Sequence, residues 1–67
     1  MKITYSKESD AAYIYLKNIS PGEVKETIEL NENIILDFDS QKKLIGIEIL
    51  SASKIMPKGA VAATLTA

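Results

Sequence analysis

The stretch Asn33–Leu50 constrains the fold more than any other, because it reads as two apolar strands around a polar turn. Alternate residues are apolar in both strands, as in a sheet with one buried face. Both apolar sets face the same side of an antiparallel hairpin only if Leu36 opposes Ile47 and Phe38 opposes Ile45. A slip by one residue would turn one set toward water, so we predict this register. The two sets are Ile34, Leu36 and Phe38 in the first strand and Ile45, Ile47 and Ile49 in the second.

Alternation also predicts three shorter strands before this hairpin, at Lys2–Tyr5, Ala11–Lys17 and Glu23–Leu30. A helix competes for the third segment, because Glu and Lys favour helices. Glu26 lies in the apolar phase of that segment, which is typical of an edge strand or a bulge. The hairpin register leaves a four-residue loop at Ser40–Lys43.

Alternation stops after Leu50. Ser51 is a candidate N-cap for a short helix at Ala52–Met56, which Pro57 would end. We therefore expect an α+β fold dominated by β-structure, with a small antiparallel sheet of four to five strands and a short C-terminal helix. Residues 1–56 would form a single β-rich domain, and residues 57–67 a C-terminal tail that is docked or flexible.

Size and composition exclude several kinds of support and several partners. A chain of 67 residues buries little surface, and such scaffolds often rely on disulfides, metals or a second subunit. Cysteine and histidine are both absent, so we expect no disulfide, no catalytic triad and no resident metal or other cofactor. Because oligomerisation is the support that remains, we expect a homo-oligomer.

The charge pattern argues against nucleic acid. The formal net charge is −1, every basic residue is lysine, and no arginine is present for bidentate phosphate or guanine recognition. The apolar runs are too short to span a membrane, and no charged-then-apolar leader precedes the first predicted strand. We expect a soluble cytoplasmic protein that binds neither nucleic acid nor membrane.

Carboxylates are the only groups with catalytic potential. Asp37 and Asp39 share a face in the predicted register, and Glu48 lies diagonal to Asp37. Such a group could hold Mg²⁺ or Ca²⁺, or act as an acid/base pair if burial raised one pKa. The simpler interpretation is a solvated face, with Asp39 starting the turn, and we expect no catalytic residue. Asp10 is expected to cap a turn by accepting hydrogen bonds from backbone amides.

Four apolar side chains fall on the face opposite the core, where polar residues are expected. Exposed apolar patches often mark interfaces, so we expect the C-terminal segment or a partner to cover them. The alternative is that they are scattered surface residues, which need no cover. In a simple meander, Leu44–Leu50 would also lie at an open edge. Three arrangements would protect that strand: cover by the tail, pairing in a non-meander order, or extension across a dimer. The candidate interface residues are Tyr13, Tyr15, Ile35 and Leu44.

Much of the chain resembles the small bacterial and archaeal domain-of-unknown-function family numbered 2283. The resemblance implies a β-rich fold with a short C-terminal helix, and it brings no activity or catalytic residue. The resemblance also implies an antitoxin-like role, because some members of the family occur beside small toxin-like proteins. Lys42 departs from the family at a turn position that typically carries glycine. The matching segments are Tyr5, Asp10–Leu16, Gly22–Thr27, Ile35–Asp39 and Leu44–Lys54, of which Gly46–Ser53 is the most specific.

The functional expectation is a small non-catalytic module that self-associates or binds another protein. Two alternatives are a small carboxylate- or metal-dependent enzyme that uses Asp37, Asp39 and Glu48, and an antitoxin-like partner of a small toxin.

Overall fold

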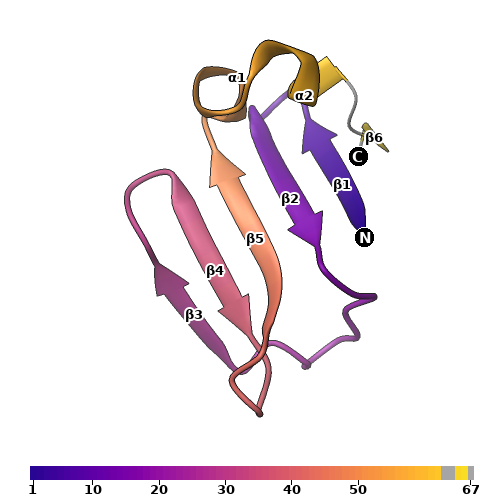
Figure 1. Ribbon diagram of the computed structural model, residues 1–67, viewed down its shortest axis with the longest axis vertical. Helices are drawn as coiled ribbons and strands as arrows, with labels where there is room; N and C mark the ends of the chain where they lie inside the picture. The colour runs from indigo at the N-terminus through magenta and orange to yellow at the C-terminus, as the bar shows by residue number, and fades with distance from the viewer. Residues whose placement is uncertain (63–64, 67) are drawn as a thin grey trace.

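One twisted sheet dominates the computed structural model, which describes residues 1–62 and 65–66 (Figure 1). Five strands pair antiparallel, and a short sixth strand pairs parallel with the first. The β-dominated α+β fold expected from the sequence is confirmed. The elements are β1 (Lys2–Ser6), β2 (Ala11–Tyr15), β3 (Glu26–Glu29), β4 (Ile34–Phe38), β5 (Leu44–Leu50), α1 (Ala52–Ile55), α2 (Lys58–Ala62) and β6 (Leu65–Thr66).

The strand order is β3-β4-β5-β2-β1-β6, so the apolar strand β5 lies in the middle of the sheet. Both of its edges are paired, with β4 on one side and β2 on the other. Of the three arrangements considered for this strand, the non-meander order is the one observed. An open edge at β5 therefore gives no reason to expect oligomerisation. The short strand β3 lies at the sheet edge, as Glu26 in the apolar phase predicted.

The β4–β5 hairpin has the predicted register in its centre and departs from it near the loop. Leu36 pairs with Ile47 as predicted, but Phe38 pairs with Leu44 and a bulge shifts the register between Asp37 and Phe38. The prediction that Phe38 opposes Ile45 is therefore wrong.

The cause of this shift lies in the loop. The Asp39 amide donates to the Lys43 carbonyl at 3.0 Å, which closes a tighter turn than the predicted Ser40–Lys43 loop. Lys42 adopts a φ of 62°, in the left-handed region. A left-handed residue at this place is typical of three-residue hairpin loops with a bulge.

Asp10, in the β1–β2 turn, holds α1 at the end of the sheet through hydrogen bonds. The Asp10 carbonyl accepts the Ala52 amide at 2.9 Å, and its carboxylate accepts the Ser53 amide at 3.0 Å and the Ser53 hydroxyl at 2.7 Å. The Tyr5 hydroxyl donates to the same carboxylate at 2.8 Å. Ser51 occupies the N-cap position, but its side chain makes no capping hydrogen bond. Asp10 thus caps α1 across the chain, rather than its own turn.

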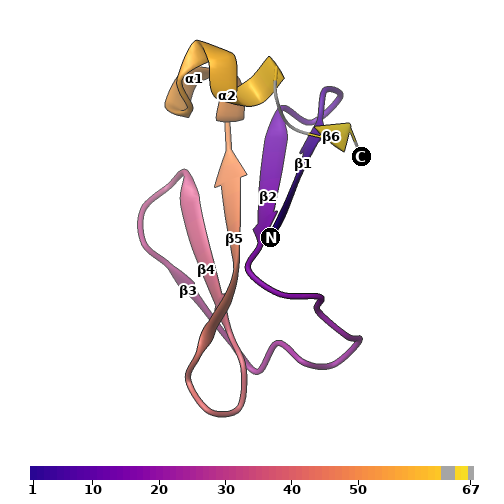
Figure 2. The same ribbon diagram turned by 45° about the vertical axis from the view of Figure 1, so that its right-hand side comes forward.

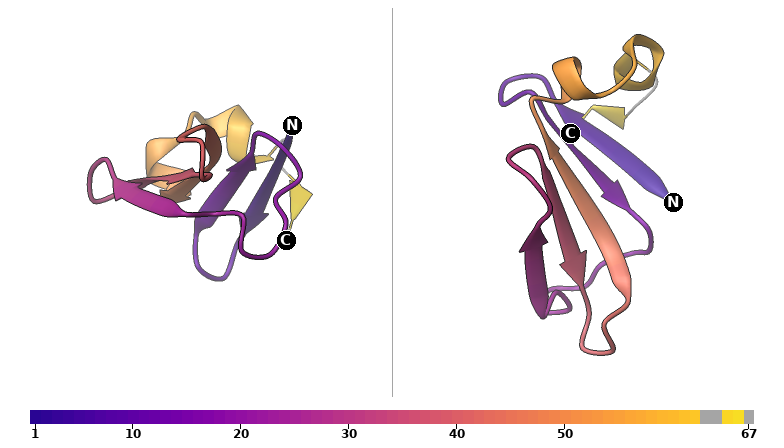
Figure 3. Two further views of the ribbon diagram at one scale, coloured as in Figure 1. Left: turned by 90° about the horizontal axis from the view of Figure 1, so that it is seen from below. Right: turned by 60° about the vertical axis from the view of Figure 1, so that its left-hand side comes forward.

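The helices cover only one end of the sheet (Figure 2). Both stand beyond the tip of β5, and Figure 3 gives the same arrangement from two further directions. Ala52 of α1 packs with Ala12 and Ile49 in the buried cluster, and Met56 packs against it. Of the six apolar residues predicted to face the core in the β4–β5 hairpin, only Ile45 and Ile49 are buried. The reason is that no second layer lies along the sheet among the described elements.

We predict that Lys42→Gly stabilises the protein. Glycine removes the left-handed strain of roughly 1–2 kcal/mol, partly offset by an unfolded-state entropy cost of about 0.5–1 kcal/mol. A net gain of about 0.5–1 kcal/mol should appear as a higher urea midpoint with an unchanged slope. Lys43→Gly is the matched control, because Lys43 has no positive φ. A gain for both variants would contradict the assignment of strain to Lys42.

We predict that Asp10→Asn destabilises the protein most above pH 5. Hydrogen bonds from Ser53, and then from Tyr5, hold the pKa of Asp10 below its usual 3.8. A carboxylate with a lowered folded pKa stabilises the fold above its unfolded pKa, and this stabilisation is lost as the pH falls through the folded pKa. The difference in melting temperature between wild type and Asp10→Asn should therefore shrink below about pH 4. Ser53→Ala removes one of these hydrogen bonds, so the loss of stability on acidification should begin at a higher pH than in wild type. Parallel melting curves at every pH would contradict the prediction.

Candidate functional site

A continuous set of side-chain contacts crosses the polar face of the sheet. The Lys2 ammonium lies 4.8 Å from the centre of the Tyr15 ring, a cation–π distance. The Tyr15 and Tyr13 rings lie 4.7 Å apart and are tilted by 54°. We call this set, which continues through Asp37 and Thr27, the polar belt.

Tyr13 carries the polar belt across the central strand. It stands on β2, and its hydroxyl reaches over β5 to donate to the Asp37 carboxylate of β4 at 2.5 Å. Thr27 of β3 donates to the other Asp37 oxygen at 2.8 Å. The belt therefore ties β1 through β5 together on this face.

Gly46 makes this reach possible. It pairs with Asp37 on one side and Tyr15 on the other, so it lies beneath the path of the Tyr13 ring. A Cβ at Gly46 would lie 2.6 Å from Tyr13 Cζ and 2.8 Å from Cε1, far inside van der Waals contact. Burial of the Tyr13 ring, followed by its bond to Asp37, raises the pKa of the Tyr13 hydroxyl well above its usual 10.0. The Tyr13 hydroxyl therefore stays protonated at neutral pH and donates its hydrogen bond to Asp37.

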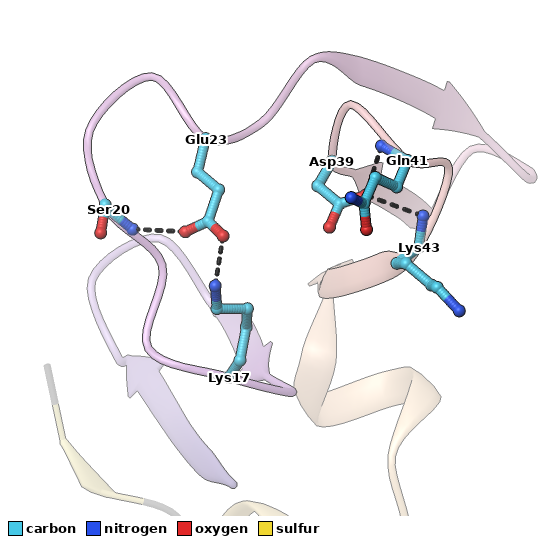
Figure 4. Close-up of polar contacts among 6 residues, drawn as sticks. All are labelled: Lys17, Ser20, Glu23, Asp39, Gln41 and Lys43. Atoms are coloured by element: carbon cyan, nitrogen blue, oxygen red, sulfur yellow. Dashed lines mark hydrogen bonds and ion pairs between the residues drawn. The ribbon is translucent and has the colours of Figure 1, made fainter.

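The three carboxylates considered as a metal or catalytic group are not brought together. Asp37 is engaged by Tyr13 and Thr27. Asp39 accepts the Gln41 and Lys43 amides at 2.9 Å each, inside the hairpin loop (Figure 4). Glu48 pairs with Ile35 and so lies diagonal to Asp37, as predicted. Among residues 1–62 and 65–66, no group of three acidic side chains is placed to hold a metal ion.

A second carboxylate at this end of the sheet is also part of a loop. Glu23 forms an ion pair with Lys17 and accepts the Ser20 amide at 2.9 Å (Figure 4). The Lys17 ammonium, and then the Ser20 amide, lower the pKa of Glu23. This contact holds the turn between β2 and β3, and exposed ion pairs of this kind contribute little to stability.

Three of the four interface residues proposed from the sequence share the polar face. Tyr13 and Ile35 each pair with Glu48, from opposite sides of β5. Tyr15 lies beside Tyr13, whereas Leu44 lies at the bulged end, opposite Phe38. The structure thus gathers Tyr13, Tyr15 and Ile35 and leaves Leu44 apart.

The opposite face carries an apolar row that the sequence assigned to the core. Backbone pairing places one apolar side chain from each of the five antiparallel strands in line. Ile28 at the edge is 43% exposed, and the other four are only half-buried. We call this set the apolar row, and its members in spatial order are Ile28, Leu36, Ile47, Ile14 and Ile3.

Small-molecule binding has weaker support than a flat interface. A pocket of about 240 Å³ is lined by Met1, Lys2, Tyr15, Lys17 and Asn18. This is smaller than the roughly 300–1,000 Å³ typical of ligand sites. No helix in the described part of the chain has the length and apolar character needed to cross a membrane.

Sequence reasoning missed the polar belt, although one signal was present. A glycine inside an apolar strand often marks a close approach of another group. Gly46 fits that rule, but the rule does not name Tyr13 as the group that approaches. Thr27 gave no comparable signal, because its role depends on the pairing of β3 with β4.

We predict that Gly46→Ala destabilises the protein by about 1–2 kcal/mol. The loss of a hydrogen bond to a charged group costs about 1.5–3 kcal/mol, and the better strand propensity of alanine returns about 0.5–1 kcal/mol. The displaced Tyr13 hydroxyl should also titrate at lower pH, which tyrosinate absorbance measures. Gly59→Ala is the control, because no atom lies within 4 Å of a Cβ built at that position. An unchanged tyrosinate titration in Gly46→Ala would contradict the proposed path of the Tyr13 ring.

Comparisons with known proteins agree with this description. The model of a family described as "Protein of unknown function (DUF2283)" matches residues 2–53. The chain is 38% identical over 55 residues to uncharacterized protein MJ0789 of Methanocaldococcus jannaschii. That alignment covers 82% of this chain but only 44% of the relative, so the chain spans less than half of that protein. No solved structure matches significantly. Since the family model covers most of the chain, the protein belongs to the DUF2283 family.

Proposed function

We propose that this protein is a non-catalytic interaction module whose binding surface is the apolar row. The observation that carries the proposal is the contrast between the two faces of the sheet. On one face, the polar belt pairs the Tyr13 and Thr27 hydroxyls with Asp37 and places the Lys2 ammonium over the Tyr15 ring. On the other face, Ile14 and Ile47 of the apolar row pack against the buried cluster of Ala12, Ile49 and Ala52, and in the described part of the chain no further layer lies over the row. A partner that buried the row would remove apolar side chains from water.

The chemistry of the remaining groups supports a binding role over catalysis. A general acid or base needs a carboxyl that is free to exchange a proton with a substrate. Asp37 and Asp39 instead accept hydrogen bonds that hold the sheet and its loop. The sequence contains no histidine or cysteine to take that role.

Two adjacent residues of β4 test which face binds. Leu36 belongs to the apolar row, and Ile35 lies on the polar face with Tyr13 and Tyr15. Tagged wild type, Leu36→Lys and Ile35→Lys would be used to recover bound protein from the native host, including untagged copies of the chain. We expect Leu36→Lys to lose the bound protein that wild type recovers, and Ile35→Lys to recover it as wild type does. Thermal melts check that both variants are folded.

The reverse result would move the binding surface to the face predicted from the sequence at Tyr13, Tyr15, Ile35 and Leu44. Equal recovery by all three proteins would contradict a binding role for either face.

A further inference from the structure

We propose that the occupant of the apolar row is a second copy of this chain, packed face to face in a two-fold symmetric dimer. This inference rests on the proposed function and names the partner at the same surface. An isologous interface requires one patch that is complementary to itself. The argument uses the charge of the patch, the exposed area of the chain and the position of the helices.

The apolar row is compatible with its own copy because it carries no charge. In the alternating phase of β1, β2, β4 and β5, every residue on this face is uncharged. The one acid in that phase is Glu26, on the exposed edge strand β3. Two copies can therefore meet without like-charge repulsion at the centre, and Glu26 would lie at the rim. A charged partner would instead desolvate its charges against aliphatic side chains.

The exposed area of the chain agrees with a missing partner. Its accessible surface is 4752 Å². A compact monomer of 7.3 kDa exposes about 4,160 Å². The excess of roughly 590 Å² approaches the ~800 Å² that each partner buries in a standard interface.

The edge of the sheet is a poorer surface for self-association. All four residues of β3 are exposed, and Glu26 and Glu29 place two acids on this short strand. Charges on a short edge strand oppose pairing with another copy, because the like charges would be brought together. The face is therefore favoured over the edge.

The position of α1 sets the orientation of the two copies. Two sheets pack about 10 Å apart, and α1 stands at one end of the face, over Ala12 and Ile49. If the copies met with their strands parallel, the two α1 helices would occupy the same space. A two-fold axis that runs across the strands places the helices at opposite ends. In that arrangement each residue of the apolar row lies opposite its own counterpart, and Ile47 is at the centre.

Oligomeric mass measures the proposal directly. Wild type should approach twice 7.3 kDa in sedimentation equilibrium as its concentration rises, and its melting temperature should rise with concentration. Leu36→Lys should weaken dimerisation about 100-fold or more, because a charge is buried without a partner. Ile28→Lys is a second variant that spares the fold, since Ile28 is exposed in the monomer. Ile35→Lys should remain dimeric.

Chemical cross-linking tests the face and the orientation. The chain has no cysteine, so single substitutions report one position each. Ile28→Cys should form a cross-linked dimer with a short bismaleimide, and its neighbour Thr27→Cys, on the other face, should not. Equal cross-linking of both variants would overturn the arrangement.

A mass that stays at the monomer value at every concentration would overturn the dimer. If the protein were monomeric but Leu36→Lys failed to recover another protein that wild type binds, the apolar row would still be a binding surface, with a different partner. If the dimer formed and Leu36→Lys left it intact, the assignment of this face to self-association would be wrong.

Discussion

The hydrogen bond from Tyr13 to Asp37 is the contact on which the rest of the structure depends. It passes over the central strand, which is possible only because Gly46 has no side chain. Its consequence is that the two faces of the sheet differ in character. One face carries hydrogen bonds among the protein's own tyrosine, acid and threonine side chains, and the other keeps a row of aliphatic side chains that are only partly buried among the described residues. The proposed function follows from this asymmetry.

The asymmetry also explains why so small a chain can keep a one-layer sheet. The described buried core holds two isoleucines and two alanines, which is little apolar burial for a folded domain. Specific contacts at both ends compensate in part, through Asp10 at the helical end and Asp39 at the hairpin loop. Each of these two acids accepts hydrogen bonds from backbone amides, so both carboxylates have a structural role.

The positions of the strands and the register at the centre of the β4–β5 hairpin could be predicted from the sequence. The alternation of apolar residues and the need to bury one face determine both. The pairing of Leu36 with Ile47 could be derived in this way. The loop could not be derived from the alternation of apolar residues, because Lys42 adopts a φ that lysine seldom takes; the family resemblance marked this position only as one that typically carries glycine. The hydrogen bonds from Ser53 to Asp10 and from Tyr13 to Asp37 could not be predicted either, because both join segments that are distant in the chain. Predicting them requires the strand order, which the sequence left open.

The central position of β5 has a consequence for how the chain acquires its structure. β1 pairs with β2 and β3 pairs with β4, so two local hairpins can form early. Only β5 joins them, and it follows all four of these strands in the chain. Until residues 44–50 emerge, the nascent chain holds two hairpins with unpaired edges, and isolated hairpins are marginal in water. Cooperative folding of the sheet therefore has to wait for β5, the single strand that joins the two hairpins.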